Sequence, residues 1–526
     1  MKGENIICSQ YAETNEGSFK ALDPAAGVFL QGDFYKAGIT DADQALTAAE
    51  TAFHSYKLIN NTLKAKFLRL IADEISAISS VLIDRASKES GLPEARLQGE
   101  LGRTTGQLRL FADLVEEGSW VDAVIDTAMP ERQPLPRPDI RRMLVPLGPV
   151  VVFGASNFPL AFSVAGGDTV SALAAGCPVI VKAHPAHLGT SALVGAAIIN
   201  AVLKSGVPKG VFSLLYDDGY TIGEYLVKHP KTKAVTFTGS LKGGTALITL
   251  AGQRNHPIPV FAEMGSINPV ILFPEAIKNR PDELAKKCAG SITLGAGQFC
   301  TNPGLLIAVR SPELEIFKES LAMAIATTPS ATMLTPAIHA SYQKLTAEIL
   351  TEEETVLLAE SVSIENRFQH QSVAKVFTVP AKQFLNSEKL KTEIFGPYSL
   401  LVIAEDMNEI EAITGQLEGQ LTVTLLAEEQ EISFHTDLLA KLSDKTGRLI
   451  LNGMPTGVEV CAAMQHGGPY PATNDSRFTS VGTGAIYRFA RPVAWQDWKP
   501  SLLPDALKDG NPLGIYRLIN QNMTKA

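Results

Sequence analysis

The stretch Ala234-Val-Thr-Phe-Thr-Gly-Ser-Leu-Lys-Gly-Gly-Thr245 joins a short apolar run to an apolar, helix-compatible run through a glycine-containing turn. This order is typical of a β-strand that ends in a tight turn and leads into an α-helix. Gly239 and Gly244 allow close backbone approach, and a helix N-terminus attracts a diphosphate. The spacing is neither the G-x-G-x-x-G fingerprint nor a Walker A loop, so a plain strand–helix turn remains an alternative.

The same alternation continues on both sides of this stretch. Apolar strands are expected at residues 150–153, 179–181, 211–215, 234–237 and 260–262, and helices at 39–86, 94–116, 164–175, 190–203 and 241–251. Short apolar strands separated by helices predict a doubly wound parallel sheet. Helices at 282–294 and 313–326, with strands at 305–309, 400–404 and 449–452, predict a second α/β unit.

Between Trp120 and Pro146 the pattern changes to alternating residues flanked by prolines at 130, 134, 136 and 138. Proline within such runs favours edge strands. We expect an extended arm that pairs with another subunit.

Length and composition restrict the class of protein. A chain of 526 residues predicts two or three domains, and a net charge of −9 argues against a nucleic-acid partner. We expect no membrane span and no signal peptide at the N-terminus. Five scattered cysteines fit a reducing cytoplasm. The nearest approach to a metal motif is His184-Pro-Ala-His187, and without further ligands we expect no metal.

Cys300 lies in the glycine-rich stretch Gly295-Ala-Gly-Gln-Phe-Cys-Thr-Asn-Pro-Gly304. A free cysteine often fills a core as a small hydrophobe. Such a position does not require the surrounding glycines, which indicate a bent loop that other groups approach closely. The pattern therefore favours a nucleophilic thiol.

Polar side chains follow several of the expected strands. Asn157 suits an oxyanion donor or an Asx turn, and Lys182 suits a ribose contact or a solvated strand end. Glu263 lies between apolar residues, where partial burial would raise its pKa and suit a general base; a solvated strand end is the alternative. Glu393 is either a further functional carboxylate or a surface charge before a turn.

Taken in order, these motifs resemble the NAD(P)-dependent aldehyde dehydrogenase superfamily over nearly the whole chain. The matching segments are Asn157, Lys182, Phe237-Thr-Gly-Ser, Glu263, Gly297-Gln-Phe-Cys300 and Glu393-Ile-Phe-Gly-Pro397. Three further segments resemble the 2-ketoglutarate-semialdehyde (2,5-dioxovalerate) dehydrogenase branch: Lys182-Ala-His-Pro-Ala-His187, Gln298 to Gly304, and His466-Gly-Gly-Pro-Tyr-Pro-Ala-Thr473. The sequence departs from the superfamily at Pro185, where glutamate is common, and at Met264-Gly-Ser-Ile267, where Leu-Gly-Gly-Lys is common.

The resemblance implies an α/β fold with a Rossmann-type cofactor domain, an α/β catalytic domain and a small β oligomerisation arm. The corresponding ranges are 1–120 with 147–262, then 263–475, and finally 121–146 with 476–526. It also implies a homodimer or homotetramer.

The implied chemistry is oxidation of an aldehyde to a carboxylate. Cys300 attacks the aldehyde, and the Asn157 amide and the Cys300 backbone N–H hold the oxyanion. Hydride then passes to the cofactor, and Glu263 activates the water that hydrolyses the thioester. The implied cofactor residues are Lys182, Gly239, Ser240, Gly244, Glu393 and Phe395.

The expected substrate is 2-ketoglutarate semialdehyde, with a fatty aldehyde as the alternative. A CoA-acylating reductase and a non-catalytic relative are rivals from other classes. Arg103, on the non-core side of helix 94–116, offers a fork for the distal carboxylate, although a solvent-exposed arginine is nearly as good an interpretation. Phe158 and His466 are assigned to the substrate site with it.

We expect NADP to be accepted well and preferred, with NAD as the other possibility. Pro185 cannot repel a 2′-phosphate, and His184, His187 or Lys182 could favour one. The carboxylates of Tyr216-Asp-Asp-Gly219 would act against that preference if they lie close.

Overall fold

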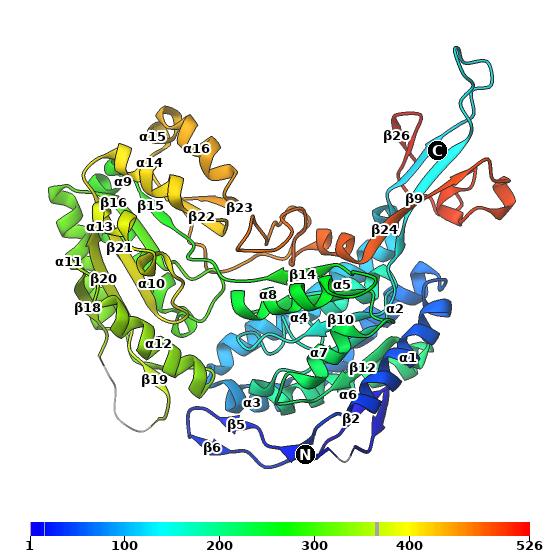
Figure 1. The fold of residues 1–526 in the computed structure, drawn as a ribbon, viewed down its shortest axis with the longest axis horizontal. Coiled ribbons are helices and arrows are strands. Elements are labelled where there is room, and N and C mark those ends of the chain that lie inside the picture. The colour runs from blue at the N-terminus through cyan, green and yellow to red at the C-terminus, as the bar shows by residue number, and fades with distance from the viewer. Residues whose placement is uncertain (1, 15, 363–367, 526) are drawn as a thin grey trace.

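The computed structural model describes residues 2–14, 16–362 and 368–525. Two seven-stranded sheets and a projecting arm make up the molecule (Figure 1). The first sheet has the order β14-β13-β10-β11-β12-β2-β3. Its five parallel strands are β10 (Val150–Phe153), β11 (Val179–Lys182), β12 (Phe212–Leu215), β13 (Ala234–Thr238) and β14 (Val260–Glu263).

Strands β11 and β12 are added on one side of β10, and β13 and β14 are added on its other side. The direction in which successive strands are added therefore changes between β10 and β13. Ligands of open α/β sheets bind beyond the carboxyl ends of the strands at such a point. The segment 154–157 leaves β10 at this edge, and the turn at Gly239 leaves β13 beside it. The predicted doubly wound sheet is confirmed, and its switch point lies at two of the predicted site segments.

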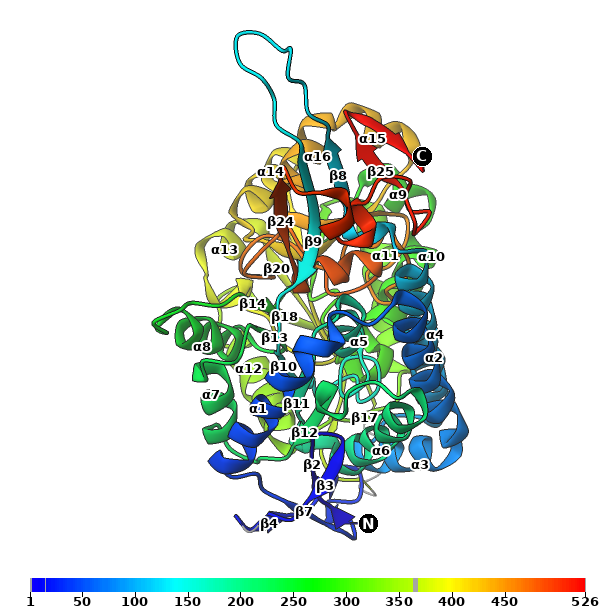
Figure 2. The ribbon, with the colours of Figure 1, turned by 90° about the vertical axis from the view of Figure 1, so that its right-hand side faces the viewer.

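Helices cover both faces of the first sheet (Figures 1 and 2). They are α1 (Ile39–Tyr56), α2 (Asn61–Ala77), α3 (Ser79–Ser90), α4 (Glu94–Glu117), α5 (Gly167–Ala175), α6 (Leu188–Ser205), α7 (Thr221–Lys228) and α8 (Leu241–Gly252). By length and composition alone, the segment Pro185–Ser205 is long and apolar enough to cross a membrane. Its residues are mainly buried and α6 contacts α2 and α3, as expected for the core helix of a folded domain.

Helix α5 begins at Gly167 and not at Val164, because the preceding residues fold back on themselves. Gly166 donates to the Ser163 carbonyl and Gly167 to the Ala161 carbonyl. A Cβ atom on Gly166 would lie 2.5 Å from the Ala161 oxygen, so this turn requires glycine. Helix α7 was not predicted from the sequence.

The second sheet has the order β18-β20-β21-β16-β15-β22-β23. These strands are β15 (Val270–Leu272), β16 (Leu305–Val309), β18 (Val356–Glu360), β20 (Lys375–Pro380), β21 (Tyr398–Ala404), β22 (Gln420–Leu426) and β23 (Thr446–Leu451). All pair in parallel except β18, which is antiparallel to β20. The helices of this unit are α9 (Pro274–Asn279), α10 (Pro281–Thr293), α11 (Pro312–Ala326), α12 (Pro336–Ile349), α13 (Ala381–Asn386), α14 (Met407–Gln416), α15 (Glu429–Phe434) and α16 (Thr436–Ser443).

A five-stranded sheet forms the arm, in the order β24-β9-β8-β25-β26. Strands β8 (Ala123–Asp126) and β9 (Ile140–Pro146) come from the proline-rich stretch, and β24 (Ala490–Gln496), β25 (Arg517–Ile519) and β26 (Asn522–Thr524) come from the C-terminal segment. Figure 1 shows β9 projecting away from both sheets. The arm has a small apolar core of its own, made by Ala123, Ile125, Leu503, Ala506, Leu507 and Ile515.

The remaining strands are short. They are β1 (Lys2–Gly3), β2 (Asn5–Ile7), β3 (Gln10–Ala12), β4 (Ser18–Phe19), β5 (Leu22–Asp23), β6 (Val28–Phe29), β7 (Asp33–Tyr35), β17 (Ala331–Thr332) and β19 (Gln371–Ser372). Strand β2 adds antiparallel to β12 at the edge of the first sheet.

Candidate active site

The loop that carries Cys300 is bent as the sequence predicted. Helix α10 ends at Thr293, and the short 3-10 helix η4 (Leu294–Gly297) follows. Gly295, Ala296 and Gly297 have φ values of 56°, 58° and 62°, three successive left-handed residues. A Cβ atom on Gly297 would lie 2.2 Å from the Gly396 oxygen. Glycine therefore lets the cysteine loop contact the loop that carries Glu393.

A buried amide network fixes the backbone on the other side of Cys300. The Nδ2 atom of Asn268 donates to the Cys300 carbonyl oxygen at 2.8 Å and to the Asn302 carbonyl oxygen at 3.0 Å. The Oε1 atom of Gln420 accepts from the backbone N–H groups of Ile267 and Asn268, both at 3.0 Å. These side chains were not predicted, and they hold the nucleophile loop against the start of the second sheet.

Three reactive side chains converge at the end of β14. The Sγ atom of Cys300 lies 3.4 Å from Nε2 of His466, which lies 3.1 Å from Oε1 of Glu263. The second carboxylate oxygen of Glu263 accepts a hydrogen bond from Ser480 Oγ at 2.5 Å. Glu263 and His466 are buried, and Cys300 is half-buried. We call Cys300, His466, Glu263 and Ser480 the catalytic cluster.

The backbone brings these residues together although they are far apart in sequence. The segment 472–474 pairs with the end of β14: Met264 donates to the Ala472 carbonyl, and Ala262 donates to the Asn474 side chain. His466 lies just before this segment and Ser480 just after it, and both close over Glu263. The sequence identified His466 through the motif it begins but gave no signal for Ser480.

The environment of Glu263 corrects one expectation. Burial raises the pKa of this carboxyl, but the contacts with His466, Ser480 and Cys300 outweigh burial and lower the pKa below its usual value. Glu263 is therefore ionised at neutral pH. Burial raises the pKa of the Cys300 thiol well above its usual value, and the Glu263 charge adds to this effect while Arg103 opposes it. The resting cysteine is therefore a thiol that needs a base.

Asn157 lies buried beside the cysteine loop. Its side-chain Nδ2 atom donates to the Gln298 backbone carbonyl oxygen at 3.1 Å, and the Asn157 backbone carbonyl oxygen accepts from Arg96 Nη2 at 2.9 Å. The Arg96 guanidinium lies over the rings of Phe158 and Phe299, 5.1 Å and 4.6 Å from their centroids. Arg96 thus links the segment after β10 to the segment before Cys300, a role that the sequence did not reveal.

Arg103 lies one heptad after Arg96 on helix α4, on the same side of the helix. Its guanidinium carbon is 5.3 Å from the Phe162 ring centroid and 5.9 Å from that of Phe158. Nε and Nη2 of Arg103 are buried and have no hydrogen-bond partner among the described residues. Burial lowers the pKa of Arg103, and the ionised forms of Cys300 and Glu100 oppose that shift. Arg103 is therefore not a solvated surface residue.

Glu100 lies between the two arginines on α4 but is engaged elsewhere. Its Oε1 accepts from the backbone N–H groups of Leu160 and Ala161 at 2.8 and 2.9 Å. Burial raises its pKa in spite of these bonds and the arginine charges. We call Arg96, Glu100 and Arg103 the arginine face of α4. On this face Nη1 of Arg96 and Nε and Nη2 of Arg103 are buried and have no hydrogen-bond partner among the described residues.

The turn after β13 is open at the surface. Gly239 and Ser240 are exposed, and Ser240 Oγ accepts from the Gly243 N–H at 3.2 Å at the start of α8. Gly244 is buried, and a Cβ atom there would lie 2.5 Å from the Met264 sulfur. Gly244 therefore serves the packing of α8 on β14, whereas the exposed turn and helix N-terminus suit a diphosphate.

Lys182 extends from the end of β11, and its Nζ donates to the Asp217 carbonyl oxygen at 2.8 Å. His184 follows with Nδ1 accepting from the Ala186 N–H at 3.1 Å, which leaves the proton on Nε2 of the neutral ring. Burial lowers the pKa of His184 well below its usual value, so it is not a cation. His187 is fully buried against the Ala155 carbonyl oxygen, at 2.7 Å, and was wrongly grouped with possible phosphate contacts.

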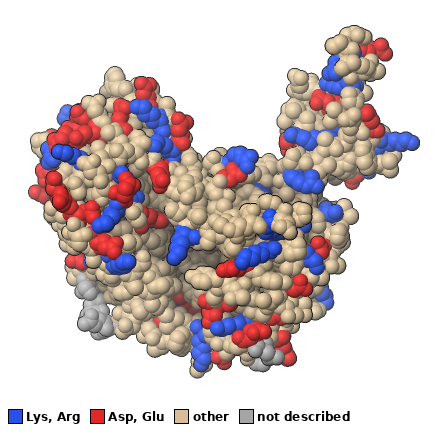
Figure 3. Space-filling model, in the orientation of Figure 1, with Lys and Arg blue, Asp and Glu red and all other residues tan. Residues whose placement is uncertain are grey.

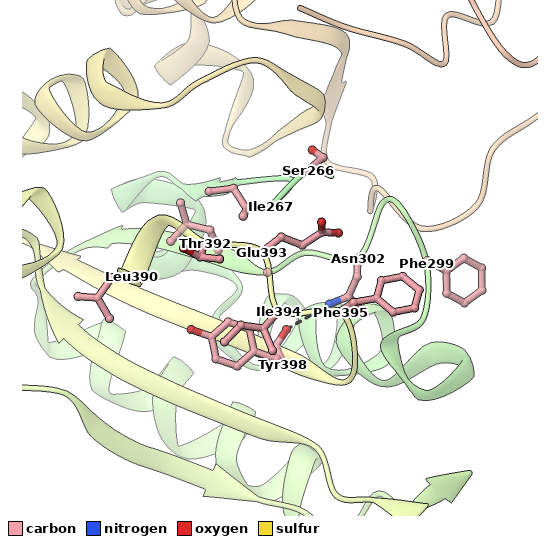
Figure 4. Close-up of a pocket in the computed structure, with 12 residues that line it drawn as sticks. Ser266, Ile267, Phe299, Asn302, Leu390, Thr392, Glu393, Ile394, Phe395 and Tyr398 are labelled. Carbon is pink, nitrogen blue, oxygen red and sulfur yellow. Dashed lines mark hydrogen bonds between the residues drawn. The ribbon is translucent and has the colours of Figure 1, made fainter. Parts of the chain in front are cut away.

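Glu393 and Phe395 line a pocket on the far side of the cysteine loop from the catalytic cluster (Figure 4). A Cβ atom on Gly265 would lie 2.4 Å from Glu393 Oε2, so the glycine of the unusual Met264-Gly-Ser-Ile segment makes room for this carboxylate. Burial raises the pKa of Glu393 to about 7, although the Ser266 N–H lowers it. Asn302, which donates to the Tyr398 carbonyl oxygen at 3.1 Å, joins this pocket to the cysteine loop.

Known proteins resemble this chain in sequence and in fold. The model of the aldehyde dehydrogenase family matches residues 11–469. The chain belongs to the aldehyde dehydrogenase family. It is 50% identical over 521 residues to alpha-ketoglutaric semialdehyde dehydrogenase 2 of Azospirillum brasilense, covering 98% of each chain. It is 48% identical over 529 residues to alpha-ketoglutaric semialdehyde dehydrogenase of Acinetobacter baylyi, covering 99% of each.

Solved structures of other dehydrogenases have the same fold. A 3,6-anhydro-L-galactose dehydrogenase superimposes with a TM-score of 0.82 at 20% identity, covering 94% of this chain and all of the other. A 1-pyrroline-5-carboxylate dehydrogenase from Thermus with bound NAD gives 0.78 at 22% identity, with 94% and 92% covered. The predicted family and fold are confirmed. Like other members of this family, the chain is an oxidoreductase that uses NAD or NADP to oxidise an aldehyde.

The surface adds little to this assignment. Figure 3 shows both signs of charge interspersed over one face, in line with the modest net charge of −9. Interspersed charges do not make the basic stripe that nucleic acids require.

Proposed function

We propose that this aldehyde dehydrogenase oxidises 2-ketoglutarate semialdehyde to 2-ketoglutarate through a thioester on Cys300. Its relatives at 50% and 48% identity are named for that substrate. One observation carries the proposal: Arg103 has two buried donor atoms without a partner among the described residues, and it lies 5.3 Å from the Phe162 ring, whose centroid is 6.4 Å from that of His466. An unpaired buried cation is costly, and a substrate carboxylate would offset that cost.

The catalytic cluster generates the nucleophile. With its ring proton on Nδ1, His466 takes the thiol proton at Nε2, 3.4 Å from Sγ, and the new Nε2–H then donates to the Glu263 carboxylate at 3.1 Å. The thiolate then attacks the aldehyde carbon. His466 is thus assigned a proton-transfer role in addition to lining the site.

The oxyanion of the thiohemiacetal is held by Asn157. The amide has two N–H donors, and Gln298 accepts only one of them, so the second is free to bond the oxygen. NAD(P)⁺ accepts the hydride when it is bound. Glu263, ionised in this environment, then removes a proton from the water that hydrolyses the thioester.

The chain offers a coherent set of cofactor contacts. The exposed Gly239–Ser240 turn and the N-terminus of α8 face a diphosphate, with Gly244 packing behind them. Lys182 and Glu393 hold the two riboses, and Phe395 lies beside Glu393. Phe158, with its ring beneath both arginines, lines the substrate side with Arg103.

We propose that NADP is preferred over NAD. The carboxylate of Asp217 is occupied by the N–H groups of Gly219 and Ile222, at 3.1 and 3.4 Å. Asp218 is paired with Lys36 at 2.8 Å. Neither acid therefore presents an uncompensated charge to a 2′-phosphate, and Pro185 is exposed where the superfamily commonly has glutamate.

We also propose a cytoplasmic homodimer or homotetramer in which the arm joins subunits. This follows the proposed division into a cofactor domain (1–120, 147–262), a catalytic domain (263–475) and an arm (121–146, 476–526). The arm exposes apolar side chains of Met129, Leu135, Leu502, Tyr516 and Met523, which a partner subunit would cover.

The proposal is tested with a panel of aldehydes, assayed with NAD and with NADP, and with and without CoA. We expect 2-ketoglutarate semialdehyde to have the highest kcat/KM and CoA to have no effect. A preference for long alkanals would assign the chain to fatty aldehydes, and dependence on CoA would indicate an acylating enzyme.

A further inference from the structure

We propose that the side chains of Cys300, His466 and Glu263 form a Zn²⁺ site through which free zinc reversibly blocks the enzyme. One ligand atom from each of these residues lies within 4.8 Å of the other two. In the part of the chain that the structure describes, this is the one group of three or more potential ligands that converges in this way.

The distances suit a tetrahedral ion. Zinc binds sulfur at about 2.3 Å and nitrogen or oxygen at about 2.0–2.2 Å, so two of its ligands lie roughly 3.3–3.7 Å apart. The Sγ–Nε2 distance is 3.4 Å and the Nε2–Oε1 distance is 3.1 Å. Small side-chain shifts are enough to bring the three atoms onto one ion. Thiolate, imidazole and carboxylate are also the ligand types that zinc selects.

The surrounding contacts indicate a weak, reversible site and not a resident metal. Ser480 donates to the second oxygen of Glu263 at 2.5 Å, which orients this carboxylate as an outer-shell partner does. The Nδ1 atom of His466, by contrast, is buried and has no hydrogen-bond partner among the described residues. A ligating histidine without that second bond holds its metal less tightly. Three protein ligands also leave one position to water.

Zinc binding replaces the S–H bond of Cys300 with a Zn–S bond and releases the proton to solvent, without oxidation or reduction. The sulfur lone pair that would attack an aldehyde is then engaged, and so is the base. Because the thiol must lose its proton to bind zinc, zinc should bind more tightly as pH rises. Inhibition by zinc rests on the proposed function, whereas zinc binding does not, because it needs no substrate.

Binding is measured first, without substrate or cofactor, by competition with a chromophoric zinc chelator. The protein carries Cys8→Ser and Cys461→Ser, which remove the half-buried cysteines outside the cluster. We expect one Zn²⁺ per chain, and at least about tenfold weaker binding in each of Cys300→Ser and His466→Gln. His54→Gln, at an exposed histidine on α1, is the matched control and should bind as the parent does.

A second readout does not depend on affinity. Co²⁺ at the same site should give a thiolate-to-metal absorption band that Cys300→Ser abolishes, while circular dichroism shows that the variant is folded. Zinc should also inhibit aldehyde oxidation in a way that EDTA reverses. Equal zinc affinity in the parent, Cys300→Ser and His466→Gln would overturn the proposal. Tight zinc binding in a protein that oxidises no aldehyde would instead overturn the proposed function and leave the metal site standing.

Discussion

The catalytic cluster and the arginine face of α4 lie near each other and balance their charges in opposite ways. In the cluster, Glu263 contacts His466 and Ser480, and His466 contacts Cys300. On the arginine face, Arg103 has two buried donor atoms without partners among the described residues. Glu100 compensates these charges only in part, because two backbone N–H groups occupy one of its oxygens and burial raises its pKa.

This difference separates chemistry from specificity. A cluster that is internally paired needs no substrate group to hold its geometry, so it can serve any aldehyde that reaches Cys300. A face with uncompensated charge is stabilised only by an anion that arrives from outside. The reaction type is therefore built into the chain, while the choice of substrate depends on what the substrate brings.

The largest effect is expected from removing the nucleophile of the cluster. Cys300→Ala should lower kcat by at least about 10⁴-fold, because no other group in the cluster can form the thioester. Cofactor binding, measured by fluorescence titration, should change little, since Lys182 and the Gly239 turn are untouched. Substantial turnover by a clean variant would place the chemistry elsewhere.

Glu263→Gln tests whether Glu263 of the catalytic cluster has a role in thioester hydrolysis that Glu100 of the arginine face lacks. Loss of the base should slow thioester hydrolysis by about 10²–10³-fold, so a burst of NAD(P)H should precede a stall. Glu100→Gln is the matched control at another buried glutamate and should show no burst. Steady-state turnover at the wild-type rate would remove Glu263 from this role.

Glu393 sharpens the comparison from the opposite side, because it is a half-buried acid without a cationic partner among the residues that the structure describes. Its pKa is raised to about 7, so between pH 4.5 and 7 the native state holds a proton that the unfolded state has lost. Ionisation of Glu393 therefore lowers the free energy of unfolding progressively as pH rises through this window, and the loss is complete above pH 7. Glu393→Gln should relieve this by on the order of 2 kcal/mol at pH 8 and very little at pH 4.5.

Thermal midpoints of wild type and Glu393→Gln, recorded across this pH range without cofactor, check the prediction. Glu418→Gln, at an exposed glutamate, serves as the control and should follow the wild type at every pH. Parallel curves for wild type and Glu393→Gln would contradict the raised pKa.

The smallest effect concerns the cofactor. Pro185→Glu should shift the ratio of kcat/KM for NADP over NAD by about tenfold towards NAD, about 1.4 kcal/mol, because a carboxylate repels a 2′-phosphate and bonds ribose hydroxyls. Pro185→Gln tests the loss of proline without the charge. An unchanged ratio in Pro185→Glu would show that the residue does not face the adenosine ribose.

Much of this molecule could be predicted from local sequence. Parallel strands such as β10 and β16 are short apolar runs with helices on either side, and their bounds agree with the prediction. The glycines before Cys300 indicated the left-handed bend that the structure shows. These features depend on neighbours in the chain, which the sequence displays directly.

The contacts between distant segments could not be predicted in this way. Ser480 reaches Glu263 across 217 positions, and Arg96 reaches Asn157 across 61, without any local pattern that marks them. The pKa of Glu263 was expected to rise because the sequence shows its apolar neighbours but not the partners that lower it. The partners of Glu263 from distant segments together outweigh its burial and lower its pKa.

The most direct test of the account compares Arg103→Met with wild type on two aldehydes of equal length, 2-ketoglutarate semialdehyde and pentanal. Methionine keeps apolar contact with Phe158 and Phe162 but removes the charge. We expect kcat/KM for the acid to fall by about 10–100-fold, mainly through KM, and kcat/KM for pentanal to stay within about twofold. An equal loss for both aldehydes, or no loss for the acid, would contradict the assignment of Arg103 to the substrate carboxylate.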